Sequence, residues 1–270
     1  MNAKLRDRVA IVTGASGSIG SETVRAFAAA GVHVVLAAPE SESPALERLA
    51  AEAREYGVRA LAVPTDLTRR ADIDRLIAAT IDAFDAIDIL ANVAGTSSAP
   101  SLADDSDADL ERVIAVNLLG CARTIHAVLP VMKRQRRGAI INIGSVAGEA
   151  GIMGIYSASK FGLRGLTDTV RREAASYNLS VTLVEPGFIR SELNHALGER
   201  LPGPDVVARV ILRAAVRARR RVIVPWYYAL AVGFAQAFPG FIDLVFGNPR
   251  IQRRLNRDAR ADREAERQAT

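Results

Sequence analysis

Two groups of residues in the sequence have the types and the spacing that chemistry requires, and the first is a tyrosine followed by a lysine. Tyr156 and Lys160 lie four positions apart, so on a helix their side chains share one face, with Cβ atoms about 6 Å apart. An isolated phenol ionises at about pH 10, so it exchanges protons near neutral pH only when a cation stabilises the phenolate. Lys160 could supply that cation. In isolation the same pair would fit an ordinary helix surface, so the surrounding residues decide between the two interpretations.

The second group is a glycine-rich turn at 13–20, with the sequence Thr-Gly-Ala-Ser-Gly-Ser-Ile-Gly. Glycine lets the backbone turn sharply and lets a ligand approach it closely. A predicted strand at 9–13 precedes the turn and a predicted helix at 18–30 follows it, so a bound pyrophosphate would meet the positively polarised end of that helix. This context predicts a dinucleotide site in preference to a turn that is merely tight.

Strands covered by helices must position both groups. Short runs rich in Val, Ile and Ala alternate with longer segments of helical periodicity, which predicts an α/β fold with a doubly wound, parallel, seven-stranded sheet and helices on both faces. Helices at 43–56 and 109–134 are each expected to end before a glycine. Ser43 is expected to cap the first of them, with Pro44 in its first turn. The expected strands are 9–13, 33–37, 59–63, 87–91, 139–143, 180–184 and 222–224.

The composition excludes several classes of protein. With 270 residues, 49% of them hydrophobic and 24% charged, the chain matches an ordinary globular protein, which excludes wholesale disorder and allows a large core without disulfides or metals. Cys121 is the single cysteine, so an internal disulfide is excluded and a reducing, cytoplasmic location is expected. The apolar stretch 9–13 is too short for a signal peptide. No metal site is expected, because the histidines have no carboxylate or cysteine at ligand spacing; they are His33, His126 and His195.

Further motifs follow these two groups in a recognisable order. An Asn-Val-Ala-Gly motif stands at 92–95, Asn117 lies in a predicted helix, Ser145 follows a predicted strand and a Pro-Gly pair stands at 186–187. Together with the glycine turn and the tyrosine–lysine pair, these motifs resemble the short-chain dehydrogenase/reductase family over about 5–191. The resemblance implies a Rossmann-like fold. The cofactor contacts that it implies are Gly14, Ser16, Gly17, Ser18, Ile19, Gly20, Asp66, Leu67, Asn92, Ala94, Gly95, Tyr156, Lys160, Pro186, Gly187, Ile189 and Ser191.

By the same resemblance the protein would be an NAD(P)-dependent oxidoreductase that interconverts an alcohol and a ketone. Tyr156 would act as general acid and base, while the cofactor would carry the hydride. Ser145 would bond the substrate oxygen, Lys160 would hold the cofactor ribose and favour the phenolate, and Asn117 would hold a water molecule that relays protons. Plainer alternatives are a turn serine at Ser145 and a buried, satisfied amide at Asn117. The competing function is that of a non-catalytic dinucleotide sensor or scaffold.

The end of the second predicted strand leaves the choice of cofactor open. Residues 37–40 read Ala-Ala-Pro-Glu, with neither the acid that would bond a ribose 2′-hydroxyl nor the arginine that would bind a 2′-phosphate. Without that acid the site does not actively repel a phosphate, although Glu40 nearby would. On these charge grounds NADP is expected in slight preference to NAD.

The last fifth of the chain differs from the rest in composition. Residues 1–203 are expected to form the dinucleotide-binding and catalytic core, and 204–270 to form the substrate-pocket region of the same domain. Seven aromatic residues fall within 226–246, which has no lysine or arginine. Flanking prolines confine its helical part to 226–238, which is too short to cross a membrane. The segment could be a lid over an apolar substrate (steroid-, lipid- or bulky ketone-like), an oligomer contact or an interfacial anchor.

The charge pattern bears on the partners. The chain carries 35 Lys and Arg against 30 Asp and Glu, a net charge of +5, and arginines flank the aromatic segment at 217–221 and 250–260. This pattern predicts peripheral contact with an anionic membrane through 226–257. Nucleic acid is not expected, because the aromatic residues are not interleaved with basic ones. The family resemblance also implies a homo-oligomer that pairs through the helices containing Asn117 and Tyr156.

Overall fold

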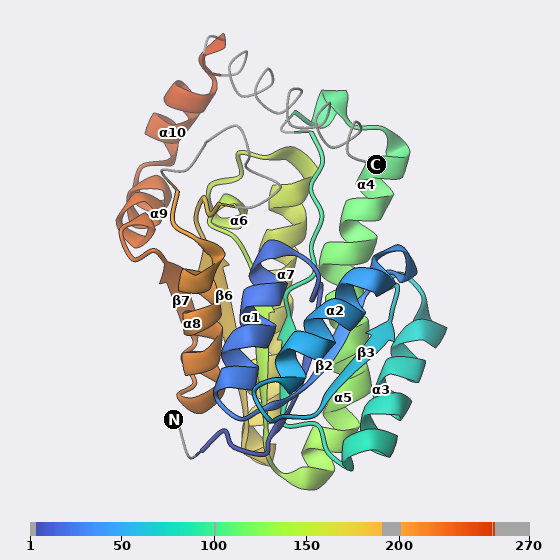
Figure 1. Cartoon of the computed structure of the whole chain (residues 1–270). Helices are drawn as coiled ribbons and strands as arrows, with labels where there is room; N and C mark the ends of the chain where they lie inside the picture. The colour runs from blue at the N-terminus through green and yellow to red at the C-terminus, as the bar shows by residue number, and fades with distance from the viewer. Residues whose placement is uncertain (1–3, 100, 191–200, 250, 252–270) are drawn as a thin grey trace.

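One parallel sheet forms the centre of the molecule. The computed structural model describes residues 4–99, 101–190, 201–249 and 251. Within these residues seven strands pair in the order β3-β2-β1-β4-β5-β6-β7, all parallel, which confirms the predicted doubly wound α/β fold (Figure 1). The strands are β1 (Val9–Thr13), β2 (His33–Ala38), β3 (Ala60–Pro64), β4 (Ile89–Asn92), β5 (Gly138–Ile143), β6 (Leu179–Pro186) and β7 (Arg221–Val224).

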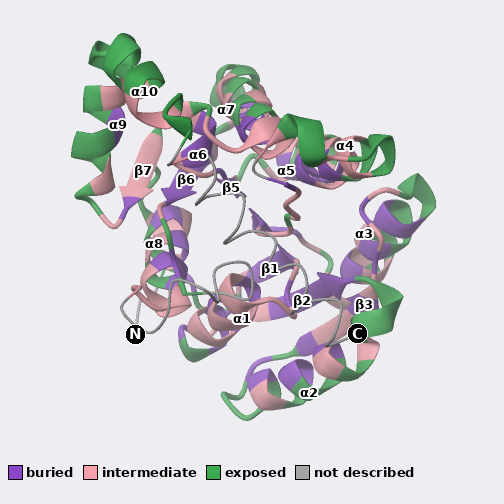
Figure 2. Cartoon of the chain, turned by 90° about the horizontal axis from the view of Figure 1, so that it is seen from above, coloured by how far each residue is buried: buried purple, intermediate pink, exposed green. Residues whose placement is uncertain are grey.

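Helices cover both faces of this sheet (Figure 2). One face carries α1 (Ser18–Ala29), α2 (Ser43–Arg54) and α8 (Pro204–Val216), and the other carries α3 (Arg70–Phe84), α5 (Cys121–Gln135) and α7 (Gly154–Ala174). Further helices belong to the connections that leave β4, β5 and β7, so they lie toward the carboxyl ends of the strands (Figure 1). They are α4 (Asp107–Ile114), α6 (Ala147–Ala150), α9 (Tyr228–Ala237) and α10 (Pro239–Phe246).

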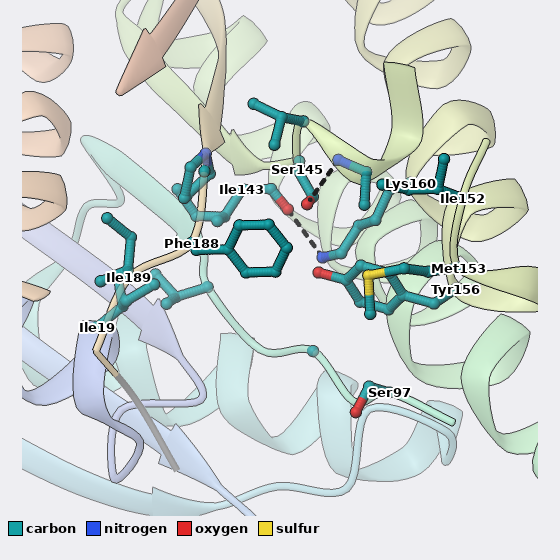
Figure 3. A pocket seen from close by; sticks show the side chains of 17 residues that line it. Ile19, Ser97, Ile143, Ser145, Ile152, Met153, Tyr156, Lys160, Phe188 and Ile189 are labelled. Atoms are coloured by element: carbon teal, nitrogen blue, oxygen red, sulfur yellow. Dashed lines mark hydrogen bonds between the residues drawn. The ribbon is translucent and has the colours of Figure 1, made fainter. Parts of the chain in front are cut away.

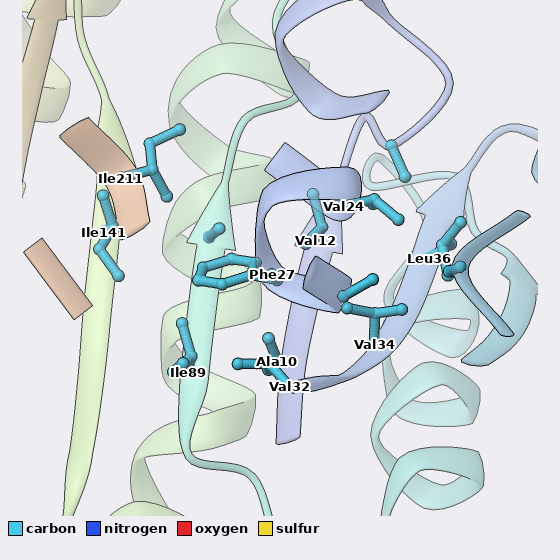
Figure 4. Close-up of a cluster of buried hydrophobic side chains, with 14 of the residues drawn as sticks. Ala10, Val12, Val24, Phe27, Val32, Val34, Leu36, Ile89, Ile141 and Ile211 are labelled. Carbon is cyan, nitrogen blue, oxygen red and sulfur yellow. The ribbon is translucent and has the colours of Figure 1, made fainter. Parts of the chain in front are cut away.

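Alternate residues of the central strand β1 face opposite layers, as the pleat of a strand requires. Ala10 and Val12 belong to the buried cluster formed with α1, α2 and α8, in which Phe27 of α1 is fully buried (Figure 4). Val9 and Ile11 belong to the cluster formed with α3, α5 and α7. Both faces are therefore out of water, which explains why β1 is a continuous apolar run up to its last residue.

Two expected helices differ in detail from the structure. The predicted helix at 109–134 is divided into α4, a π-helical segment over Ala115–Gly120 (η3) and α5. The expectation that Ser43 caps α2 is wrong. The 3-10 turn η1 (Glu40–Glu42) runs directly into α2, so Ser43 already has helical backbone angles, whereas a capping residue needs an extended backbone. Pro44 does lie in the first turn, as predicted.

The direction of the crossovers changes between β1 and β4. From β1 the chain winds outward through β2 and β3, and it then returns to place β4 on the other side of β1. Thr13 at the end of β1 pairs in register with Asn92 at the end of β4. Ligands of open α/β sheets bind in the crevice outside the strand ends at such a switch point. The fold thus places the glycine turn beside the loop that follows β4.

A buried carboxylate links three central strands at their amino ends. Asp88, just before β4, is 6% exposed and accepts a hydrogen bond from the backbone N–H of Val9 (3.0 Å). It also accepts from Arg8 (2.9 Å) and Arg137 (2.8 Å). Arg8 precedes β1 and Arg137 precedes β5, so one carboxylate serves β1, β4 and β5. Removing the charge while the donors remain leaves them without their acceptor.

We expect Asp88→Asn to lower the free energy of unfolding by about 1–3 kcal/mol, because the amide removes the charge and places its own donor among donors. The matched control is Asp74→Asn, whose carboxylate pairs with Arg70 on the exposed surface of α3 at 2.8 Å, where such a pair contributes little. Urea unfolding of both variants measures the difference. Equal midpoints for the two variants would show that the buried carboxylate does not hold the strands together.

Candidate active site

Close approach of backbone segments shapes the glycine turn. Gly14 has a φ of +62°, which glycine adopts readily, and a Cβ there would lie 2.6 Å from the Cα of Ala94. A Cβ on Gly20 would lie 1.9 Å from the carbonyl oxygen of Gly14. Side chains are excluded at both positions, so α1, β1 and the loop after β4 come together.

The turn opens onto a cleft of about 690 Å³. Helix α1 begins after Gly17 without a side-chain cap, so the N–H groups of its first turn are open to a ligand. A pyrophosphate fits such a site, because these N–H groups and the positive end of the helix attract negative charge. The lining includes residues that the family resemblance implied, namely Gly14, Ser16, Gly17, Ser18, Ile19, Gly20, Ala94 and Gly95.

A second cavity of about 170 Å³ adjoins this cleft and contains the tyrosine and the lysine (Figure 3). Ile19, Val93 and Gly95 line both spaces, so a ligand that fills the cleft would extend into the cavity. Ser191 lies outside the described residues. The predicted site residues that line the cavity are Ser145, Tyr156, Lys160, Pro186, Gly187 and Ile189.

Tyr156 and Lys160 belong to the first two turns of α7 and line the cavity together. Lys160 is 5% exposed, and its Nζ donates a hydrogen bond to the carbonyl oxygen of Ile143 at the end of β5 (2.9 Å). The Nζ lies 5.7 Å from the centre of the Tyr156 ring. This position lets the ammonium attract negative charge that develops on the ring oxygen. The spacing in the sequence therefore does produce a shared face, and that face points into a cavity.

Asn117 lies in the π-helical segment η3 and is fully buried. Its Oδ1 accepts a hydrogen bond from the N–H of Thr96 (2.8 Å), and its Nδ2 donates to the carbonyl oxygen of Thr96 (2.8 Å) and to Ser159 Oγ (3.0 Å). A Cβ on Gly95 would lie 3.4 Å from Oδ1 and 3.2 Å from the Nζ of Lys160. The satisfied amide thus holds the loop after β4 beside the lysine, and the water-relaying role stays a prediction.

Ser145 begins the segment that joins β5 to α7. Its Oγ accepts a hydrogen bond from the N–H of Ala147 (3.1 Å), at the start of the short helix α6. The same side chain lines the cavity with Tyr156 (Figure 3). Ser145 is therefore a turn residue whose side chain also lines the cavity, and its bond to a substrate oxygen stays a prediction.

Asn92, which the resemblance assigned to the cofactor, is engaged within the protein instead. Its side chain is 1% exposed, donates to Asn142 Oδ1 (2.9 Å) and accepts from Thr124 Oγ1 (2.8 Å). Asn142 in turn donates to Thr167 Oγ1 (2.9 Å). This buried chain of hydrogen bonds joins β4 and β5 to α5 and α7. Asn92 therefore holds these elements together, and its side chain does not line the cleft.

Asp66 and Leu67 also have partners away from the cleft. Asp66 accepts hydrogen bonds from the N–H (2.8 Å) and the hydroxyl (2.7 Å) of Thr68. Leu67 is buried, and a Cβ on Gly120 would lie 2.9 Å from its Cβ. Neither residue is among those that line the cleft or the cavity, so their assignment to the cofactor stays a prediction.

Some residues of the site were not identified from the sequence. Ile152, Met153 and Phe188 give the cavity an apolar wall. These residues come from the connections after β5 and β6, so they follow no helical or strand period. In the sequence, only their positions close to Ser145 and to the Pro-Gly pair could have identified them. The acid that lines the cleft is Glu42, two positions beyond the acid that the sequence suggested.

The aromatic segment forms two short helices. Helix α9 ends at Ala237, and α10 begins at Pro239 with its axis bent by 103°. The expected single helix over 226–238 is therefore only part of the segment, because a proline that cannot continue one helix can begin the next. By length and composition alone, α9 and α10 taken together as one broken span are long and apolar enough to cross a membrane. The helical stretch Asp107–Gln135 is also long and apolar enough, and it packs against β4, β5 and α7.

Helix α9 also supports the wall of the cavity. The ring centres of Tyr228 and Phe188 lie 6.5 Å apart, and a Cβ on Gly187 would lie 2.3 Å from the Tyr228 ring. Away from this contact most residues of both helices are exposed (Figure 2), and large apolar side chains are among them. The large exposed ones are Trp226, Tyr227, Leu230, Phe234, Phe238, Phe241 and Leu244.

Two of the arginines that precede this segment in sequence are paired within the protein. Arg220 donates to Asp168 near the carboxyl end of α7 (2.7 Å). Arg221 is directed inward to two buried carboxylates, one of which also accepts from Gln236 of α9. The contact of this region with an anionic membrane stays a prediction.

Known proteins show the same sequence pattern and the same fold. The family model for the short chain dehydrogenase matches residues 8–202. A 3-oxoacyl-[acyl-carrier-protein] reductase of Synechocystis sp. is 40% identical over 195 residues, which are 72% of this chain and 78% of the relative.

Solved structures give a consistent result. A short chain dehydrogenase/reductase from Burkholderia phymatum, in complex with NAD, has 25% identity and a TM-score of 0.80, over 88% of this chain and 95% of the other. An NAD+-bound xylitol dehydrogenase has 25% identity and a TM-score of 0.75, over 82% and 98%. With the family model covering most of the chain, this protein belongs to the short-chain dehydrogenase/reductase family of oxidoreductases.

Proposed function

We propose that the protein is an NAD(P)-dependent oxidoreductase that interconverts an alcohol and a ketone on an apolar substrate. The observation that carries this proposal is that Tyr156, Lys160 and Ser145 line one cavity, which shares a wall with the cleft at the glycine turn. The N–H groups at the start of α1 have no side-chain cap, so they are open to a pyrophosphate. The NAD complexes of two structural neighbours support the nucleotide.

The residues of the cavity divide the reaction between them. When bound, a nicotinamide dinucleotide supplies or accepts a hydride. During reduction the hydroxyl of Tyr156 gives its proton to the carbonyl oxygen, and during oxidation the same oxygen takes the proton of the alcohol. Lys160 attracts the negative charge left on the phenol, and Ser145 donates to the substrate oxygen. The amide of Asn117 holds the loop that carries Gly95, so that the lysine keeps its place.

An apolar substrate is supported by the character of the wall. Phe188, Ile152 and Met153 face the cavity with Val146, and such a wall favours aliphatic or aromatic groups over charged ones. The reductase of Synechocystis is named for a 3-oxoacyl group, which is a ketone on an acyl chain. We infer a lipid-like or bulky ketone, with the steroid-like alternative as part of the same class.

We expect Tyr156→Phe to lower kcat by about 10²- to 10⁴-fold, because the variant keeps the ring and loses the transferable proton. The control is Tyr177→Phe, since Tyr177 lies in η4 (Ala175–Tyr177) beyond the other end of α7 and contacts Lys133. NADH absorbance with a panel of apolar ketones, including a 3-oxoacyl thioester, measures turnover. Unchanged turnover in Tyr156→Phe would remove this residue from the chemistry. Nucleotide binding without turnover of any substrate by the wild type would favour the sensor or scaffold.

The charge at the edge of the cleft bears on the choice between the two nucleotides. Glu42 lines the cleft and accepts a hydrogen bond from Ser16 of the glycine turn. A carboxylate there can accept from ribose hydroxyls and repels a 2′-phosphate. The slight preference for NADP inferred from 37–40 did not include this residue, so we propose NAD as the preferred cofactor.

We expect NADH to bind wild type more tightly than NADPH, and Glu42→Gln to improve the affinity for NADPH on the order of tenfold, because one unit of repulsion toward the 2′-phosphate is removed. Glu47→Gln is the control, since Glu47 is exposed on α2 and does not line the cleft. Fluorescence titration of each variant with both nucleotides gives the ratio of the dissociation constants for NADPH and NADH. A ratio that Glu42→Gln leaves unchanged would show that this carboxylate does not select the cofactor.

We further propose that α9 and α10 contact an anionic membrane surface through 226–257. Two short helices bent by 103° expose aromatic and aliphatic side chains beside the substrate cavity, which is the composition of interfacial helices. The charge for this contact would come from the arginines of 250–260, which follow α10 in sequence. A homo-oligomer is proposed separately, through the helical faces that expose Leu119 and Phe161.

We expect wild type to float with vesicles of phosphatidylcholine and phosphatidylserine, and the double variant Leu230→Asp/Leu244→Asp to float several-fold less, because burying a charge in the interface is unfavourable. Leu102→Asp is the control, since Leu102 is also exposed but lies in η2 (Leu102–Asp104). Loss of self-association in the double variant, without any flotation of wild type, would identify the surface as an oligomer contact and overturn the membrane proposal.

A further inference from the structure

Two carboxyl groups lie buried behind the cavity wall and take no part in the proton transfer. Glu149 belongs to α6 and Glu185 to the end of β6, and their side chains are 1% and 2% exposed. Buried carboxylates are unfavourable unless charged partners and hydrogen-bond donors surround them. What surrounds these two therefore indicates what they do.

Glu149 receives donors from three elements. Its Oε2 accepts hydrogen bonds from Arg164 of α7 (2.5 Å) and from Gln236 of α9 (2.5 Å), and it lies 3.0 Å from Nη2 of Arg221 in β7. Its Oε1 is buried and finds no hydrogen-bond partner among the residues that the structure describes. A buried acceptor that receives no hydrogen bond lowers the stability of the fold, so this oxygen needs a donor.

Glu185 can be that donor. It lies within hydrogen-bonding reach of Glu149, and its own Oε2 accepts from Arg221 Nε. Burial, together with the neighbouring Glu149, raises the pKa of Glu185 to about 7 against the opposing effect of Arg221. Glu185 therefore keeps its proton up to near neutral pH, and a protonated carboxyl is a hydroxyl donor.

The pair also lies against the segment that carries the chemistry. A Cβ on Gly144, the residue before Ser145, would lie 3.0 Å from the Cγ of Glu185. Helix α6, which carries Glu149, lies between Ser145 and Tyr156. Through Gln236 the same carboxylate binds α9, the helix that supports the apolar wall of the cavity.

We propose that Glu149 and Glu185 share one proton and act as a positioning pair, which holds α9 and the segment 145–156 together around the cavity. The charged groups that face the pair are Arg221 from β7 and Arg164 from α7, while α9 contributes the neutral Gln236. With the shared proton present, the two carboxyl groups carry one negative charge beside Arg221 and Arg164. Loss of the proton leaves two adjacent carboxylates in the interior, and their repulsion weakens the attachment of α9.

The sign of the pH dependence follows from linkage. The pKa of Glu185 in the closed state is raised to about 7, above the ordinary value of about 4.3 that it regains when the pair is exposed. The closed state therefore binds the proton more tightly than the open state, and its stability falls as pH rises from about 4.3 to about 7. Below about pH 7, each unit of pH increases the opening of α9 on the order of tenfold, and above pH 7 both states have lost the proton, so the opening stays constant. Between pH 6 and pH 8 the opening should therefore increase on the order of tenfold in total.

Hydrogen–deuterium exchange of the full chain, read by mass spectrometry over α9 and corrected for intrinsic amide rates, measures this opening without any substrate. We expect wild type to show the roughly tenfold increase between pH 6 and pH 8, and Glu185→Gln to stay protected at both, because its amide always has a proton to donate to Glu149. Glu173→Gln should behave as wild type, since Glu173 pairs with Lys133 on the exposed far part of α7.

A second variant changes an exposed residue and so leaves the buried core intact. Gln236 is exposed, so Gln236→Ala should fold normally while it cuts the tie between α9 and the pair. We expect its α9 exchange to be fast at both pH values. Equal pH dependence in wild type, Glu185→Gln and Gln236→Ala would overturn the proposal.

The consequence for turnover rests on the proposed function. We expect the KM of wild type for an apolar ketone to rise between pH 6 and pH 8, and that of Glu185→Gln to stay flat, with a smaller difference in kcat. A KM profile that is identical in the two enzymes would show that the pair does not position the site. Absence of turnover in every variant, with the exchange differences intact, would reject the oxidoreductase and retain the carboxyl pair.

Discussion

The carbonyl oxygen of Gly14 lies 1.9 Å from the place where a Cβ of Gly20 would stand, and the Cα of Ala94 lies 2.6 Å from a Cβ of Gly14. Three segments of backbone therefore meet without intervening side chains at the end of β1. This contact fixes where α1 begins, and so where its unpaired N–H groups point. It also fixes the loop after β4, whose Gly95 forms part of the wall shared by the cleft and the cavity. A larger residue at Gly14 or Gly20 would clash with this backbone and force the segments apart.

Buried polar groups hold the other side of the site in place. The chain of hydrogen bonds from Thr124 through Asn92 and Asn142 to Thr167 ties the ends of β4 and β5 to α5 and α7. Lys160 is fixed on the carbonyl oxygen of Ile143 at the end of β5. Since an unmet polar group in the interior is costly, these bonds resist displacement, and the ammonium keeps a constant position beside Tyr156. Apolar packing alone would not specify that position so narrowly.

The C-terminal region completes both the fold and the cavity. Strand β7 adds the last strand to the sheet, and α8 packs on α1. From the end of β7 the chain turns into α9, whose Tyr228 lies against Phe188 in the apolar wall. Arg221 at the start of β7 joins the two buried carboxyl groups behind that wall. The part of the chain that lies beyond the family match thus packs against the apolar wall of the cavity.

The sequence by itself determined the elements and placed the glycine turn between a strand and a helix. All seven strands, the helical face shared by Tyr156 and Lys160 and the glycine turn could be predicted, because periodicity and spacing are local properties. Only the tertiary structure decided which side chains meet across the sheet. Asn92 reads as a ligand contact and is bonded to Asn142, fifty positions away. Glu149 accepts a hydrogen bond from Gln236, eighty-seven positions away, and Arg221 pairs with both Glu149 and Glu185. Contacts of this kind depend on how helices and strands pack, which no local pattern records.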